Sequence, residues 1–269
     1  MNALKLKLTL PIAAILATVA SCSPKVAEII ALQKTEVDID GQANEYGEFR
    51  YYNSEAKMFY ALSNDSSNLY LCLKVNDETM QQQIIMAGMD VWLDTLSKSK
   101  ERIGIRYPLG GIRPTAPSFR EAGEPKGKPD MMTQMKKELL LSQKTMDLRG
   151  FKNVANGSNL MQTPEGIKLQ VDWDNSNSMI YELVIPLKNW YKANLTKSDT
   201  TKIFTLTINI NALEMPSGPP GGFSGPPPGG NTPSGGGMGG PPSGMRPPMD
   251  GLSEKKTVKA NFKLHINVP

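Results

Sequence analysis

The sequence has few of the residues from which catalytic and metal centres are commonly built. Its 269 residues include one histidine, His265, and two cysteines, Cys22 and Cys72. One histidine cannot form a multi-histidine zinc site. A Ser-His-Asp triad would have to use His265, and neither a nucleophile elbow nor a glycine-rich phosphate loop accompanies it. The sequence therefore favours a non-catalytic protein, although glycoside hydrolysis by a carboxylate pair that no motif selects stays open.

Clustered positive charge is also missing. The formal net charge is +4, and it becomes +2 (4 − 2) once Lys5 and Lys7 are assigned to a segment that we expect to be removed. Binding to nucleic acid through counterion release needs a concentrated basic surface. We therefore expect no nucleic-acid partner.

Long apolar runs are confined to the N-terminus. Lys5 and Lys7 precede an apolar run from Leu8 to Ala20, which is too short to span a bilayer well and is typical of a secretory signal. Val19-Ala20-Ser21-Cys22 resembles the lipobox of bacterial lipoproteins. This predicts a signal peptide over residues 1–21, lipid on Cys22, and anchoring of the protein in the bacterial cell envelope. Ser23 in place of Asp favours the outer membrane.

Acylation of Cys22 would leave Cys72 as the one free thiol, so no intramolecular disulfide can form. Leu71 and Leu73 flank Cys72 in an alternating segment. We expect the side chain of Cys72 to act as a small buried hydrophobe rather than as a nucleophile.

Alternation of apolar and polar residues dominates the rest of the chain and predicts strands. The expected strands are residues 69–75, 90–94, 102–107, 167–174, 181–185, 204–210 and 262–268. One short helix is expected from Asp130 to about Leu141. The fold class is therefore a two-sheet antiparallel β-sandwich, jelly-roll or immunoglobulin-like, with long loops. Residues 22–34 are expected to be a tether and residues 35–269 one domain.

Glycine and proline are concentrated in one insertion. Residues 216–251 contain 13 Gly and 11 Pro, and this segment interrupts the strand pattern. Because so few of its side chains are apolar, we expect it to be disordered rather than to form its own core. Residues 108–129 are expected to form a second long loop, of the kind that serves a site or is disordered.

Four motifs in a fixed order resemble the family-nine carbohydrate-binding module. They are Val37-Asp38-Ile39-Asp40-Gly41 followed by Glu45-Tyr46, Asn68-Leu69-Tyr70-Leu71 leading to Asp77, Gly88 to Asp94, and Tyr181 to Leu187. The resemblance implies a two-sheet sandwich related to the DOMON group and a carbohydrate ligand. Tyr46 stands where that family usually has Trp, and no binding residue of the family carries over to this sequence.

One set of residues is a candidate ligand site. If Val91 and Leu93 point inward, then Asp90, Trp92 and Asp94 share the opposite face, where an aromatic ring between carboxylates suits a sugar. The carboxylate oxygens of Asp90 and Asp94 could instead bind calcium. The alternative to a ligand site is that the helix or the long loop covers Trp92. Trp173 and Trp190 are expected in the core. Haem held by His265 and a methionine is the remaining cofactor alternative, and no residue spacing favours it.

The sequence therefore predicts a lipid-anchored envelope protein with a non-catalytic, glycan-binding sandwich. The alternative is a structural or assembly lipoprotein whose long loops contact protein partners in the envelope.

Overall fold

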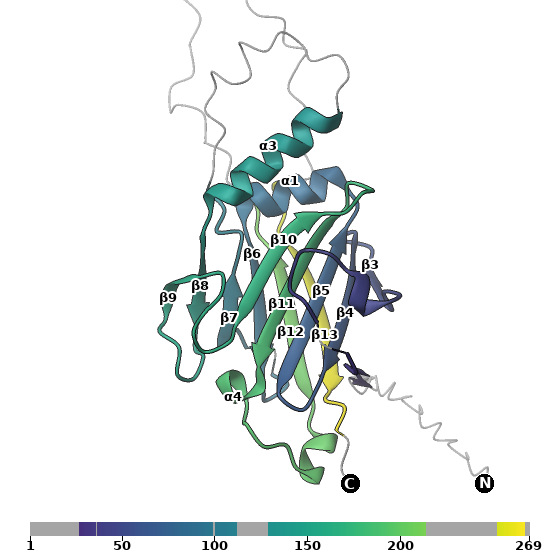
Figure 1. Cartoon of the computed structure of the whole chain (residues 1–269), viewed down its shortest axis with the longest axis vertical. Helices are drawn as coiled ribbons and strands as arrows, with labels where there is room; N and C mark the ends of the chain where they lie inside the picture. Colours follow the sequence, from purple (N-terminus) through teal and green to yellow (C-terminus); the bar gives the residue numbers. More distant parts are fainter. Residues whose placement is uncertain (1–26, 36, 99, 112–128, 214–251, 267–269) are drawn as a thin grey trace, which may run out of the picture.

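Two β-sheets pack face to face around one hydrophobic core in the computed structural model of this protein (Figure 1). The structure describes residues 27–35, 37–98, 100–111, 129–213 and 252–266. The first sheet has the order β1 (Glu28–Ile29), β13 (Lys256–Lys263), β12 (Phe204–Ile210), β6 (Met89–Asp94), β7 (Ile103–Arg106), β8 (Thr145–Arg149), β9 (Gly157–Leu160). The second has the order β10 (Lys168–Trp173), β11 (Met179–Pro186), β5 (Asn68–Val75), β4 (Met58–Asn64), β2 (Ala31–Leu32), with β3 (Tyr51–Asn53) also paired to β4.

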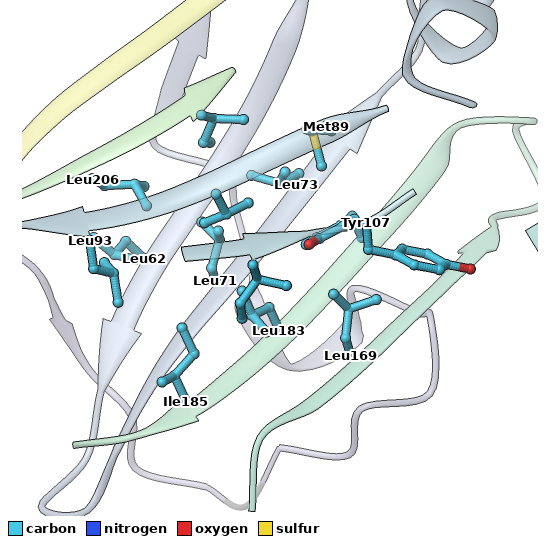
Figure 2. Close-up of a cluster of buried hydrophobic side chains, with 14 of the residues drawn as sticks. Leu62, Leu71, Leu73, Met89, Leu93, Tyr107, Leu169, Leu183, Ile185 and Leu206 are labelled. Carbon is cyan, nitrogen blue, oxygen red and sulfur yellow. The ribbon is translucent and has the colours of Figure 1, made fainter. Parts of the chain in front are cut away.

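The expected β-sandwich is confirmed, and the alternation explains it. On β6, Val91 and Leu93 are buried in the core, as the pattern predicted. Figure 2 shows apolar side chains of both sheets meeting in this core, with Leu71 and Leu183 from one sheet and Leu93 and Leu206 from the other. All seven expected strands are present within a few residues, except that β13 begins earlier, at Lys256, and ends at Lys263.

The start of the described chain belongs to the sandwich rather than to a tether. β1 pairs in parallel with β13, and β2 pairs in parallel with β4, so the chain joins both sheets within a few residues. Ile30 lies between the two strands and is buried in the core. These two short pairings are parallel, whereas the remaining strand pairings are antiparallel.

Two helices, α1 (Glu78–Ala87) and α3 (Pro129–Ser142), cover one end of the sandwich, and the short α4 (Leu187–Trp190) lies at the opposite end (Figure 1). The expected helix is present as α3, but α1 and α4 were not expected. Two 3-10 turns, Asn44–Tyr46 and Lys197–Thr201, complete the elements. Among the described residues, no helix is both long and apolar enough to cross a membrane.

The sequence carried the signals for α1. The side chain of Asp77 accepts a hydrogen bond from the Met80 amide at 2.9 Å, which caps the first turn. Gly88 follows the last turn and donates its amide to the Ile84 carbonyl. Met80, Ile84 and Ile85 then form the buried face at helical spacing.

Several predictions lie outside the described residues. The signal peptide, Cys22 and the Gly/Pro-rich insertion are among them, as is most of the loop that was expected before α3. These remain predictions from the sequence.

Candidate functional site

A groove lies on the outer face of the second sheet. Strand register places five side chains in one row across this face, because directly paired residues point to the same side. The row runs from β10 to β3 through Asp172, Ile180, Lys74, Phe59 and Tyr52. The first four residues of the row line the floor of the groove, and Tyr52 lies beyond its lining.

The N-terminal segment 37–49 forms one wall of the groove. Its first part covers the outer face of the sheet, where Val37 packs against Tyr70 and Val184. Gly41 has φ +87°, and a Cβ at this position would lie 2.7 Å from Cβ of Asp172. A side chain would therefore clash with β10, and glycine allows the covering segment to lie directly on the sheet. We call residues 37–49 the strap.

The opposite wall is the turn between β10 and β11. The groove encloses about 780 Å³, within the range of small-molecule sites. Its lining combines aromatic rings with amides, carboxylates and an amine: Gln42, Ala43, Asn44, Gly47, Glu48, Phe49, Phe59, Lys74, Asn76, Asp172, Trp173, Asp174, Asn175, Ser176 and Ile180.

Asp174 holds this turn in shape. Its Oδ1 accepts hydrogen bonds from the amides of Ser176 and Ser178, at 2.8 and 2.9 Å, and its Oδ2 pairs with Lys74 Nζ at 2.8 Å. Partial burial acts to raise the pKa of Asp174, but the Lys74 amine and the two amides outweigh it and lower the pKa. Asp174 is therefore a fixed anion, and it positions the Lys74 amine at the floor of the groove.

A second hollow adjoins the groove on the other side of Asp172 and Trp173. It encloses about 400 Å³ between the end of α3 and the edge of β10. Its lining is Tyr107, Lys137, Leu140, Leu141, Gln143, Lys144, Met161, Gln170, Val171, Asp172 and Trp173, so it shares the last two residues with the groove. Lys137 Nζ lies 3.0 Å from Asp172 Oδ1 at this junction.

No protein-family model matches this chain, and no curated protein matches it. Among solved structures it is similar to a family 9 carbohydrate-binding module from Caldicellulosiruptor kristjanssonii in complex with glucose. The sequence identity is 7%, the match covers 91% of this chain and 97% of that one, and the TM-score is 0.42.

The three residues selected from the sequence share a face, but other contacts already engage them. Three backbone amides, of Leu96, Lys98 and Lys100, donate to the Asp94 carboxylate. Burial acts to raise the pKa of Asp94, and these donors lower it below its usual range. Asp94 therefore organises the loop after β6.

Asp90 and Trp92 are similarly occupied. Asp90 Oδ2 accepts from Asn211 Nδ2 at 2.9 Å, and Oδ1 lies 3.7 Å from Arg106 Nε. The indole of Trp92 lies against Gly104 on β7, so close that a Cβ there would be 2.2 Å from Trp92 Cε3. Its Nε1 is buried and has no hydrogen-bond partner within the part of the chain that the structure describes. These side chains support their own sheet, on the opposite side of the sandwich from the groove.

The remaining residues singled out from the sequence are the two tryptophans expected in the core, the free thiol and the histidine. Trp173 and Trp190 are buried in the core, as expected. Cys72 is a free, buried thiol, and burial raises its pKa far above the usual range, which fits a structural role. His265 follows the end of β13, and its backbone bonds to Asn64 through both the amide and the carbonyl.

A buried carboxyl group fastens the strap to the sheet. Glu182 is on the outer face of β11, yet it is fully buried, and its Oε2 accepts from the amides of Asp40 and Gly41 at 3.0 and 2.6 Å. Burial is the main reason that the pKa of Glu182 is raised to about 7; the two amides oppose this, while the charges of Asp40 and Glu45 add to it. Burial likewise raises the pKa of Tyr46 well above its usual range.

The groove was not predicted from the sequence. Asn175 and Ser176 in the turn, like Asn76, are ordinary loop residues by composition. No local pattern indicates that the strap lies over β10 and β11. Among the described residues, no group of three or more His, Cys, Asp or Glu side chains is placed to hold a metal ion.

Proposed function

We propose that this protein binds carbohydrate, without catalysis, in the groove between the strap and the β10–β11 turn. The observation that carries the proposal is the lining of the groove. The rings of Phe49 and Phe59 line the groove together with amide and carboxylate side chains. A sugar ring needs both kinds of surface, because its C–H face packs on an aromatic ring while its hydroxyls need donors and acceptors.

The two charged side chains at the floor, Lys74 and Asp172, each have an ion-pair partner already. Lys74 pairs with Asp174, and Lys137 with Asp172, so a neutral ligand can enter without leaving an ion unpaired. Charge-assisted hydrogen bonds from such groups to hydroxyls are stronger than those between neutral partners. A neutral, hydroxyl-rich ligand is therefore the best match to this lining.

The sequence adds the cellular setting of the proposal. The lipobox-like segment ending at Cys22 supports a lipid-anchored protein in the bacterial envelope, with the outer membrane favoured. Growth with an alkyne-labelled fatty acid should label the wild-type chain and leave Cys22→Ser unlabelled. Labelling of Cys22→Ser at the wild-type level would contradict the anchor.

The binding proposal is tested by calorimetric titration of the full-length chain with a panel of glycans. Asn76→Ala and Phe49→Ala should each weaken binding by about tenfold, the loss expected for one hydrogen bond or one stacking contact. Asn194→Ala is the matched control, because Asn194 is exposed and lies outside the groove lining.

The same titration separates the groove from the site that the sequence suggested. If Trp92→Phe abolishes binding while Asn76→Ala does not change it, the ligand binds on the first sheet and the groove proposal is wrong. If no glycan binds at millimolar concentration, carbohydrate binding itself is wrong. The envelope-scaffold alternative would then be the better hypothesis.

A further inference from the structure

The groove and the adjoining hollow together exceed what one sugar unit needs. The groove encloses about 780 Å³ and the hollow about 400 Å³. Both are lined by Asp172 and Trp173, so they meet at the end of β10. A ligand that occupies one of them at this junction has the other directly beside it.

The junction itself offers contacts to a ligand that passes over it. The side chains of Lys137 and Asp172 are 40% and 47% exposed, although they are paired at 3.0 Å. An exposed amine next to an exposed carboxylate provides both donors and acceptors. Hydroxyls of a bridging sugar could bond to either group without breaking the pair.

The hollow beyond the junction also has a lining suited to a sugar. Tyr107, Leu140 and Met161 give it an apolar floor, and Lys144 stands at its rim. Gln143 uses its Oε1 to accept from the Leu109 amide at 2.7 Å. Its Nε2 is buried and has no hydrogen-bond partner among the described residues.

From these observations we infer that the ligand is an extended oligosaccharide that lies across the Lys137–Asp172 pair and occupies both the groove and the hollow. This inference rests on the proposed function. The inference extends the proposed function, because the site would hold consecutive units of a sugar chain rather than one terminal sugar. Units in the hollow then contribute affinity that a monosaccharide cannot gain.

The experiment is a length series titrated against the full-length chain. Glucose, the disaccharide, the tetrasaccharide and the hexasaccharide are compared in both the α-1,4-linked and the β-1,4-linked series. In the series that binds, the tetrasaccharide should bind at least about tenfold more tightly than the monosaccharide. The affinity rises with length because only the longer ligand fills the hollow as well as the groove.

Substitutions in the lining of the hollow then show whether the extra affinity arises there. Leu141 is 72% exposed, so Leu141→Asn combined with Lys144→Ser changes the rim of the hollow without opening the core. The double variant should reduce the gain with length to less than about threefold and leave monosaccharide affinity unchanged. The matched control is Leu96→Asn with Lys197→Ser, two exposed positions outside the linings of the groove and the hollow, and it should keep the full gain.

The outcomes separate this inference from the proposed function. Equal affinity for monosaccharide and tetrasaccharide would overturn the inference while leaving carbohydrate binding intact. A gain with length that the double variant keeps in full would also overturn it, because the extra units would lie outside the hollow. Absence of binding in both series overturns the inference and counts against the proposed function as well.

Discussion

Trp173 donates its indole Nε1 to Gln81 Oε1 at 3.1 Å, which ties the last residue of β10 to α1. The same oxygen accepts from Lys136 Nζ of α3 at 3.2 Å. The amide nitrogen of Gln81 donates to the carbonyls of Val75 and Asn177, at 2.9 and 2.8 Å. One buried glutamine thus links both helices to the end of β5 and to the turn that walls the groove.

Replacing Gln81 should destabilise the fold strongly. Gln81→Leu would leave the Trp173 indole, the Lys136 amine and two carbonyls without their partner, and each unsatisfied buried group costs about 1–3 kcal/mol. Because some of these groups can relax towards solvent, we expect a loss of about 2–4 kcal/mol in the free energy of unfolding, measured by urea denaturation. Gln82→Leu, on the adjacent and partly exposed position, is the matched control. A Gln81→Leu variant as stable as the control would show that this network contributes nothing.

Glu182 should make stability depend on pH. Its pKa is raised to about 7 by burial, whereas an unperturbed glutamate in the unfolded chain ionises near pH 4.3. Between these values the folded state keeps a proton that the unfolded state has lost. The contribution of this group to stability is therefore highest below about pH 4 and falls as the pH rises towards 7, by about 4 kcal/mol at most.

The test of this pH dependence is Glu182→Gln, which keeps a side-chain oxygen for the amides of Asp40 and Gly41 but cannot ionise. At pH 8 the variant should be about 1–3 kcal/mol more stable than the wild type, and below pH 4 the two should be equal. Glu138→Gln, at an exposed position on α3, should follow the wild-type curve. If Glu182→Gln also follows that curve, the pKa of Glu182 is the same in the folded and unfolded states, and burial does not raise it.

Gly104 should tolerate no side chain beneath Trp92. A Cβ at this position would lie 2.2 Å from Trp92 Cε3 and 2.6 Å from Cζ3, so Gly104→Ala forces the indole out of its place. Overpacking of this kind costs about 1–3 kcal/mol of unfolding free energy, which denaturation would measure. Adding Trp92→Leu should recover part of the loss, since a shorter side chain leaves room for the methyl group.

The Gly104→Ala variant also bears on where the ligand binds. It displaces Trp92 but leaves the second sheet untouched, so glycan affinity in the groove should be unchanged within about twofold. Lost affinity in a variant that remains folded would argue for a ligand on the first sheet.

The sequence by itself determined seven of the strands and which of their faces enter the core; β1 to β4, β8 and β9 were not predicted. Alternation is a local property, so Val91 and Leu93 could be assigned to the core without knowing their partners. The start of α3 was likewise readable, and the cap at Asp77 and the glycine at Gly88 are local signals for α1. Register between strands was not readable, because it depends on residues far apart in the chain.

Only the tertiary structure decided what lies on the outer faces. Cys72, which the sequence predicted to be buried, and Glu182 both lie on the outer face of the second sheet, and the strap is what covers them there. Alternation suggested Asp90, Trp92 and Asp94 as free to bind a ligand, whereas backbone amides, Asn211 and Gly104 already engage them. The groove exists because the strap, β5 and the β10–β11 turn meet, and a period-two pattern carries no information on which distant segment covers a given face.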